Sequence, residues 1–342
     1  MPTFKITDDV PSRRLQSGHE GESPFVVLDD VRKTYAQARS KERVRAVDGV
    51  SLTVRRGETL GLVGESGCGK STIARVLVGM DQPDSGSVII DGQARTQLTT
   101  AALKTMRRRV QIIFQDPHGA LDPRMWLGDS LDAPLSAHGL GDARARRDKA
   151  VAMLEAVGLD AGFLGRLPRE CSGGQLQRIV IARALLLEPE VLICDEPTSA
   201  LDASVRAQVL NLLVDLRRRF ALTLIVISHD LRVVRFMCDR VAVMYLGRIV
   251  ETAPRDALFD APRHPYTKAL LAASMIDATG LHDPAGQLPG EPPSPRHPPS
   301  GCHFHTRCFA AEPVCRAEPP VLEPIGDERH VRCHRWRALS GV

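Results

Sequence analysis

Apolar residues along this chain fall into two patterns, short runs that suit strands and longer spaced sets that suit helices. Short β-type runs occur at residues 25–31, 50–54 and 87–92, with the sequences FVVLDDV, VSLTV and SVIIDG. The last of them follows the turn signal Asp84-Ser85-Gly86. These runs predict a small mixed or antiparallel sheet, and the run TLGLVG at 59–64 predicts a buried strand that ends in glycine.

The pattern becomes helical between about Leu121 and Leu187, where Ala150, Leu154 and Val157 stand four and three residues apart among charged residues. Strand-like runs return at 190–196 (EVLICDE) and 222–230 (LTLIVISHD). A helix between them is predicted by an apolar stripe that consists of Val205, Val209, Leu212, Leu213, Leu216 and Phe220. Strands that alternate with helices indicate an α/β core with a parallel sheet.

Length and composition indicate a globular protein with more than one domain. The chain has 342 residues, of which 43% are hydrophobic and 25% are charged, so it can bury a core of normal size without disulfides. No apolar run approaches the roughly 20 residues that a transmembrane helix needs. A net charge of +4 is too small to indicate a nucleic-acid partner, and we expect none.

The two ends of the chain differ from its middle. Residues 1–24 are polar and lack the apolar stretch of a secretory signal, which predicts a disordered leader and a protein that stays in the cytoplasm. After Leu281, the proline-rich segment at 283–301 predicts a linker or an extended wrap. A cluster of cysteines follows it.

A phosphate-binding loop is indicated where the strand at 59–64 runs into GESGCGKST. Residues 64–71 match the pattern G-x-x-x-x-G-K-[ST] at every fixed position. Glycines let backbone N–H groups curl around phosphate oxygens, and the N-terminus of the following helix favours an anion. Lys70 is expected to contact the β- and γ-phosphates of a nucleotide, and Ser71 to bind Mg²⁺. Nucleotide contacts are expected from Gly64, Glu65, Ser66, Gly67, Cys68, Gly69, Lys70, Ser71 and Thr72.

Two acidic residues at the end of a later strand complement this loop. Four apolar residues (VLIC) precede Asp195 and Glu196, so both carboxylates come at the end of a buried strand. We expect Asp195 to hold Mg²⁺ through water, and Glu196 to polarise the attacking water as general base.

The string CSGGQLQR at 171–178 resembles the signature motif of the ATP-binding cassette (ABC) ATPases, with Cys171 in place of the usual leucine. The other motifs of that family occur in order over about 200 residues. Gln115 in VQIIFQDP matches the Q-loop, SALD at 199–202 the D-loop, and His229 in VISHD the switch histidine. Tyr35 is placed as the aromatic residue that stacks on adenine. A P-loop kinase or a small GTPase would lack SGGQ and the late histidine.

Three further stretches are similar to the ATPases of oligopeptide and dipeptide importers. They are FQDPHGALDPRM in the Q-loop region, VMYLGRIVETA with HPYTKALLAA (243–273), and the terminal pattern GE-P-P-S-P with GC-x-F-x-x-R-C. Within that group, GESGCGKST and FQDPHGALDPR resemble the F-type subunit more than its D-type partner.

The resemblance implies an α/β fold. It consists of a P-loop NTPase cassette with a RecA-like core, an antiparallel β subdomain, an inserted α-helical subdomain and a small loop-rich C-terminal extension. On this chain we expect a leader at 1–24, a nucleotide-binding domain at 25–265 with its helical subdomain at about 116–187, and the extension at 266–342.

The resemblance also implies an ATP site that two subunits share head to tail, the second being a paralogous ABC ATPase. SGGQ opens a helix whose N-terminus can bind the γ-phosphate held by the partner. His229 would hold that phosphate together with Glu196, and Gln115 would reach Mg²⁺ or the attacking water. The helical segment would pass the resulting movement to the membrane subunits. The signature residues expected to bind the partner's nucleotide are Ser172, Gly173, Gly174 and Gln175, and Asp202 of the D-loop is also expected to bind nucleotide.

The function implied is an ATPase that energises peptide import from the cytoplasmic face of the inner membrane. Its partners would be two transmembrane permease subunits and, indirectly, an extracytoplasmic solute-binding protein. A related importer for nickel, glutathione, an opine or a sugar oligomer is one alternative. A soluble cassette ATPase that acts on DNA or ribosomes is another, but such proteins usually carry two cassettes or a coiled-coil insertion. Glu196 and His229 argue against a nucleotide sensor without activity.

The terminal cysteines Cys302, Cys308, Cys315 and Cys333 have the spacing C-x5-C-x6-C-x17-C. Zinc sites usually contain a C-x2–4-C pair, and this cluster has none. Disulfides are disfavoured in a reducing compartment. A [4Fe–4S] cluster accepts thiolates from more widely spaced loops, so it fits this spacing best. The resemblance to the peptide-importer ATPases supports the same choice, because their corresponding extension looks like a cluster-binding segment. Two alternatives stay open: four reduced, packed cysteines, or zinc with help from a nearby histidine among His303, His305, His330 and His334.

Overall fold

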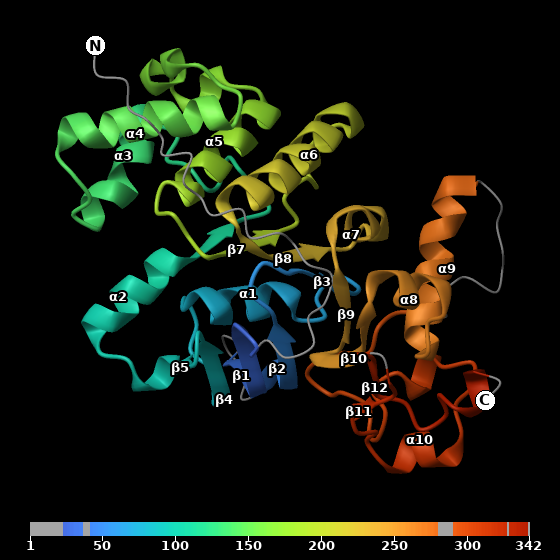
Figure 1. Cartoon of the computed structure of the whole chain (residues 1–342). Helices are drawn as coiled ribbons and strands as arrows, with labels where there is room; N and C mark the ends of the chain where they lie inside the picture. Colours follow the sequence, from blue (N-terminus) through green and yellow to red (C-terminus); the bar gives the residue numbers. More distant parts are fainter. Residues whose placement is uncertain (1–22, 37–41, 280–289, 327, 341–342) are drawn as a thin grey trace.

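The computed structural model describes residues 23–36, 42–279, 290–326 and 328–340. Figure 1 shows two sheets in this part of the chain with the helix α1 (Lys70–Val78) between them. The smaller sheet is antiparallel, in the order β2-β1-β4-β5, which confirms the sheet expected from the first apolar runs. Its strands are β1 (Val26–Ala36), β2 (Arg43–Val54), β4 (Ser85–Ile90) and β5 (Gln93–Ala94).

The larger sheet has the order β11-β12-β10-β9-β3-β8-β7-β6 within the described residues. From β9 to β6 its neighbouring strands run parallel, and β10, β12 and β11 extend one edge in antiparallel fashion. Its strands are β3 (Thr59–Val63), β6 (Val110–Ile113), β7 (Val191–Asp195), β8 (Thr223–Ser228), β9 (Arg240–Tyr245), β10 (Arg248–Pro254), β11 (Glu323–Pro324) and β12 (His330–Val331). The predicted parallel α/β core is therefore confirmed.

Each face of the parallel strands packs against a different set of helices, because side chains alternate along a strand. Val191 and Ile193 of β7 share a core with α1 and the small sheet. Leu192 and Cys194 of the same strand share the other core with α5 (Gly173–Leu185) and α6 (Ala203–Phe220). The helices α1 and α5 therefore lie on opposite faces of the sheet, as Figure 1 also shows.

The region predicted to be helical contains α3 (Leu127–Ala137), α4 (Ala143–Ala156) and α5, with 3₁₀ turns at Ala161–Gly165 and Pro168–Glu170. These helices pack on one another through side chains that are fully buried, among them Leu131, Leu135 and Leu154. The apolar positions Ala150, Leu154 and Val157 are buried as their spacing predicts.

The stripe predicted on α6 is correct at its centre and wrong at its end. Val209, Leu213 and Leu216 are buried, but Phe220 is 36% exposed and Leu210 is buried instead. The last turn of the helix contains three arginines, 217–219, and extends beyond the core. The helix ends at Phe220, and Ala221 after it has the left-handed conformation (φ 50°). Phe220 is therefore a surface residue.

The C-terminal residues are part of the larger sheet. Strand β12 pairs with β10, with Val331 opposite Glu251, and Val331 is fully buried. The remaining helices are α2 (Thr100–Arg109), α7 (Leu231–Met237), α8 (Arg255–Asp260), α9 (Pro265–Thr279) and α10 (Pro313–Ala317). Among the described residues, no helix has both the length and the hydropathy to cross a membrane. Nearly all of the leader predicted at 1–24, and residues 283–289 of the proline-rich segment, lie outside the described ranges.

Candidate functional site

The glycine-rich loop between β3 and α1 has backbone conformations that only glycine adopts easily. Gly64 has φ 154°, and a Cβ there would lie 2.2 Å from the carbonyl oxygen of Met244. Gly69, which precedes α1, has φ 111°, and a Cβ there would lie 2.1 Å from the carbonyl oxygen of Ala46. The loop is thus wedged against β2 and β9, while Ser66 and Gly67 at its tip are exposed.

Lys70 is buried and points back into this loop. Its ammonium Nζ donates hydrogen bonds to the carbonyl oxygens of Gly64 (2.7 Å) and Glu65 (2.9 Å) and lies 3.8 Å from Cys68 Sγ. Burial raises the pKa of the Cys68 thiol, although Lys70 acts in the opposite direction. The loop therefore holds a fixed positive charge at the position where a phosphate-binding loop would receive an anion.

Ser71 and Asp195 lie together next to the loop. The Ser71 hydroxyl donates a hydrogen bond to the Asp195 carboxylate at the end of β7. Burial raises the pKa of Asp195, and the Ser71 hydrogen bond acts against that shift. Two hard oxygen ligands beside a phosphate site fit the donor set that Mg²⁺ prefers.

Glu196, the next residue, lies between two side chains from distant parts of the chain. Its Oε2 accepts a hydrogen bond from Gln115 Nε2 (2.9 Å), and its Oε1 lies 2.9 Å from His229 Nδ1. Glu196 has the left-handed φ of 48°, which is uncommon for a residue with a side chain and is typical of functional sites. Its backbone N–H donates to the carbonyl of Ile227 on β8, which holds this conformation.

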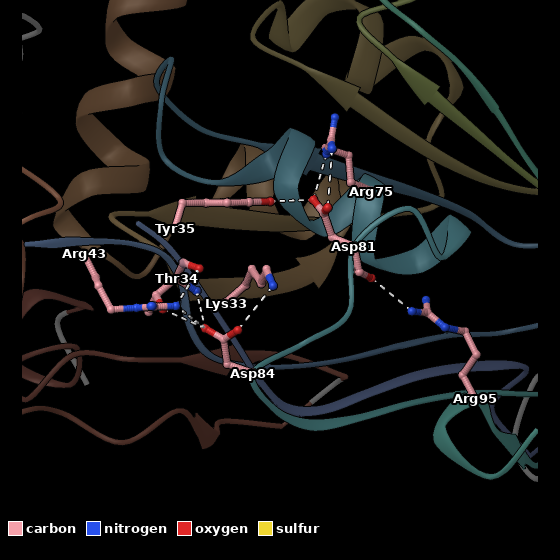
Figure 2. Close-up of polar contacts among 8 residues, drawn as sticks. All are labelled: Lys33, Thr34, Tyr35, Arg43, Arg75, Asp81, Asp84 and Arg95. Carbon is pink, nitrogen blue, oxygen red and sulfur yellow. Dashed lines mark hydrogen bonds and ion pairs between the residues drawn. The ribbon is translucent and has the colours of Figure 1, made fainter. Parts of the chain in front are cut away.

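Tyr35, near the end of β1, is held by side chains from α1 and from the loop between α1 and β4 (Figure 2). Its hydroxyl donates to Asp81 Oδ2 (2.6 Å), and Asp81 also accepts from Arg75 Nε (2.8 Å). The Arg75 hydrogen bond lowers the pKa of Asp81. Burial and the contact with Asp81 raise the pKa of Tyr35, whereas a hydrogen bond with Thr72 of the phosphate loop opposes that shift.

A second acidic residue of the same loop ties it to β1. Figure 2 shows Asp84 beside Thr34 and Lys33. The backbone N–H and the hydroxyl of Thr34 donate to Asp84 Oδ2 (2.7 Å each), and Lys33 Nζ donates to Oδ1 (3.2 Å). Arg95 Nη2 donates to the carbonyl of Asp81 (3.0 Å). The position of the Tyr35 ring relative to α1 is thereby fixed.

The SGGQ segment begins α5 with a capping box. Ser172 Oγ accepts from the backbone N–H of Gln175 (3.3 Å), and Gln175 Oε1 accepts from that of Ser172 (2.9 Å). A Cβ on Gly174 would lie 2.5 Å from Val205 Cγ1 of α6, so the two helices approach closely there. Because α5 and α1 lie on opposite faces of the sheet, the segment sits apart from the phosphate loop of its own chain. Asp202 caps α6 at its N-terminus without a hydrogen bond from its side chain.

Two residues that the sequence analysis did not single out contact the phosphate loop. The Tyr266 hydroxyl on α9 accepts a hydrogen bond from the backbone N–H of Glu65 (2.9 Å). Arg307 forms two hydrogen bonds with the Glu65 carboxylate, at 2.8 and 3.0 Å. The sequence contained only an indirect signal, because both residues belong to stretches similar to the peptide-importer ATPases.

The four terminal cysteines line one cavity together with Phe304, His264, His305 and His334. All eight cysteines of the chain are free thiols. Burial raises the pKa of Cys302 to about 11 and that of Cys333 to about 12. Backbone N–H groups act against these shifts, and that of Arg335 lies 3.4 Å from Cys333 Sγ.

All four histidines considered as substitutes for a thiol have other hydrogen-bond partners. His305 Nδ1 lies 2.9 Å from the carbonyl oxygen of Cys302, and His334 Nε2 lies 2.9 Å from that of Glu318. His303 Nδ1 lies 3.2 Å from the carbonyl oxygen of Leu246, and His330 Nδ1 lies 3.2 Å from Thr252 Oγ1. In the described part of the chain, no three His, Cys, Asp or Glu side chains form a group that could hold a metal ion.

Comparison with protein families gives two matches. The family described as ABC transporter matches residues 47–199, and the family described as oligopeptide/dipeptide transporter, C-terminal region, matches residues 250–315. The second match covers Tyr266, Arg307 and three of the four terminal cysteines.

Individual relatives match along most of their length. The chain is 48% identical over 330 residues to a putative peptide import ATP-binding protein of Brucella abortus (strain 2308), which covers 95% of this chain and 98% of that protein. It is 47% identical over 298 residues to the oligopeptide transport ATP-binding protein AppF of Bacillus subtilis (strain 168), covering 86% of this chain and 90% of AppF. Among solved structures, the ATP-binding cassette MJ0796, in a dimeric post-hydrolysis state with ADP and Pi, has a TM-score of 0.61 and 31% identity, covering 67% of this chain and 98% of that chain.

Proposed function

The chain belongs to the ABC transporter ATPases of the oligopeptide/dipeptide type, and we propose that it hydrolyses ATP to drive the import of peptides across a cell membrane. The observation that carries this proposal is the contact of Glu196 with both Gln115 and His229, next to Asp195, Ser71 and the phosphate loop. Residues from four separate segments meet there at the end of the parallel strands. The relatives named as peptide transport ATP-binding proteins, AppF among them, support the peptide class and the F-type subunit.

Each of these side chains has a proposed role in hydrolysis. Lys70 would contact the β- and γ-phosphates in place of the loop carbonyls, and Ser71 and Asp195 would hold Mg²⁺, which would neutralise phosphate charge. Glu196 accepts the proton of the attacking water. His229 keeps Glu196 oriented and contacts the γ-phosphate, and Gln115 senses whether that phosphate is present. Tyr35 provides a ring face for adenine.

A second ATPase subunit is proposed to complete the site. The signature helix α5 lies on the opposite face of the sheet from α1, so Ser172 to Gln175 would meet the phosphates of a partner chain rather than those of their own. The solved relative MJ0796 is itself a dimer. We infer a head-to-tail pair of ATPases, a paralogue being the partner, bound on the cytoplasmic face of the membrane to two permease subunits that receive solute from a binding protein.

The transported solute is tested by uptake into cells in which the native gene carries Glu196→Gln. We expect the accumulation of radiolabelled di- and oligopeptides to fall at least about 10-fold, because the importer would lose its energy source. Uptake of nickel, glutathione, an opine and a sugar oligomer in the same cells is the control. If peptide uptake is unchanged while one of these others is lost, the peptide assignment is wrong.

The cysteine cavity is proposed to hold a [4Fe–4S] cluster. Its four thiols line one cavity, and backbone N–H groups contact the sulfurs of Cys302, Cys308 and Cys333, as at protein iron–sulfur sites. A single zinc ion fits less well, because zinc sites usually contain a C-x2–4-C pair and these four cysteines have none. Reduced packed thiols remain the competing state.

Metal analysis of the anaerobically purified chain distinguishes these states. We expect about four irons and four sulfides per chain, with absorbance near 400 nm. Cys308→Ser is expected to lose the iron, while Cys171→Ser, outside the cavity, keeps it. One zinc per chain without iron, or a protein free of metal, would overturn the cluster proposal.

A further inference from the structure

Two residues of the C-terminal region contact the phosphate loop, and both contact Glu65. Tyr266 contacts the backbone of Glu65, and Arg307 contacts its side chain. Tyr266 lies on α9, and Arg307 ends a 3₁₀ turn at His305–Arg307, immediately before Cys308. Sequence separations of 201 and 242 residues make these contacts a property of the tertiary fold.

The side chain of Arg307 is buried, and its contacts hold the guanidinium in one position. Its side chain is only 5% exposed. It also donates to the carbonyl of Gly290 (3.1 Å), and its guanidinium lies 6.0 Å from the centre of the Tyr245 ring. Because a planar guanidinium matches a carboxylate in two parallel hydrogen bonds, this geometry specifies an arginine rather than any cation.

Arg307 packs against a cluster of aromatic rings. Tyr245, Tyr266 and Phe304 pack on one another with centroid distances of 4.6, 5.2 and 5.4 Å, and all three are fully buried. Tyr245 ends β9, Tyr266 belongs to α9, and Phe304 lies between Cys302 and Cys308. The cluster therefore joins the end of β9, inside the larger sheet, to the cysteine segment.

The carboxylate of Glu65 lies in the phosphate-binding loop and needs a positively charged partner such as Arg307. An uncompensated negative charge on Glu65 would repel the phosphates of ATP and would favour a different loop conformation. The positive charge of Arg307 balances the negative charge of Glu65, so the pair presents no net charge to the phosphates of ATP. The Glu65 carboxylate points toward Arg307 in the C-terminal region.

We propose that Arg307 is a positioning residue of the ATP site, which neutralises Glu65 and, with Tyr266, holds the phosphate loop in the shape that binds ATP. The inference rests on ATP binding at this loop, as proposed above. It assigns to the C-terminal region a direct effect on nucleotide affinity, and it places the residue responsible next to one of the cavity cysteines.

A double-mutant cycle on the full-length chain tests this. The dissociation constant of the non-hydrolysable analogue AMP-PNP with Mg²⁺ is measured for the wild type, Arg307→Ala, Glu65→Gln and the double variant. We expect Arg307→Ala to raise the dissociation constant about 10-fold in the wild-type background and less than about 2-fold in the Glu65→Gln background. Arg307→Lys should fall between, since it keeps the charge but loses the paired geometry.

Arg332→Ala controls for general loosening of the extension. Arg332 donates to the carbonyls of Ile249 (2.9 Å) and Pro320 (3.2 Å) in the same region, and neither hydrogen bond involves Glu65. Any increase in the dissociation constant caused by Arg332→Ala should be the same in the wild-type and Glu65→Gln backgrounds. In steady-state assays Arg307→Ala should raise the KM for ATP far more than it lowers kcat.

Equal effects of Arg307→Ala in both Glu65 backgrounds would overturn the positioning role, since the loss would then be structural. A wild-type chain that fails to bind AMP-PNP at all would instead count against the proposed function. The two failures are therefore distinguishable.

Discussion

Glu196→Gln is expected to lower the kcat of ATP hydrolysis by about 10³-fold while ATP stays bound. The amide retains the shape of the carboxylate and can still pair with Gln115 and His229, so the site should keep its geometry. It cannot accept the proton of the attacking water at neutral pH. ATP would then remain between the two subunits, and the ATPase dimer should become stable enough to isolate.

Hydrolysis is measured with the complete transporter, and bound nucleotide is identified after the protein is denatured. Glu190→Gln is the matched control, because Glu190 lies just before β7 and pairs with Arg56 and Arg109 outside the site. That variant should keep at least about half of the wild-type kcat. Hydrolysis by Glu196→Gln at the wild-type rate would remove Glu196 as the general base.

Lys70→Ala is expected to abolish nucleotide binding, with the dissociation constant for ATP raised about 100-fold or more. Lys70 is the buried cation of the phosphate loop, and its ammonium already lies among the loop carbonyls of Gly64 and Glu65. Alanine would leave these carbonyls facing the phosphates without a positive charge between them.

The effect of Lys70→Ala is followed by titration with a fluorescent ATP analogue. Lys149→Ala, on the surface of α4 where it pairs with Glu188, removes the same charge away from the loop and should leave the dissociation constant unchanged. Circular dichroism of both variants checks that the chain is folded. Tight binding of the analogue by a folded Lys70→Ala chain would contradict the role assigned to Lys70.

The local part of this site could be predicted from sequence because its signals are local. The phosphate loop needs glycines at positions with unusual φ and a lysine at the start of the next helix, and all of these lie within eight residues. Asp195 and Glu196 follow a short apolar run that predicts a buried strand. The structure then brings Gln115, Glu196 and His229 together because parallel strands end at the same edge of the sheet.

The contacts made by Arg307, Tyr266 and Asp81 could not be predicted in this way. An arginine before a cysteine, or an aspartate in a turn, has no periodic or spacing signal that names its partner. Phe220 shows the opposite error, since its position in a helical repeat predicts burial, yet the helix extends beyond the core at that point. The cysteine spacing suggested a shared site, but only the fold shows that the four thiols line one cavity.

The distance in sequence between Glu65 and Arg307 has a consequence for protein synthesis. The two residues are 242 positions apart, so at roughly 5–20 residues per second Arg307 is translated about 12–50 s after Glu65. During that interval the nascent chain carries a complete phosphate-loop sequence that lacks its outer support. On the proposed role of Arg307, newly made chains become competent for tight ATP binding late, only after Arg307 has been translated and has paired with Glu65.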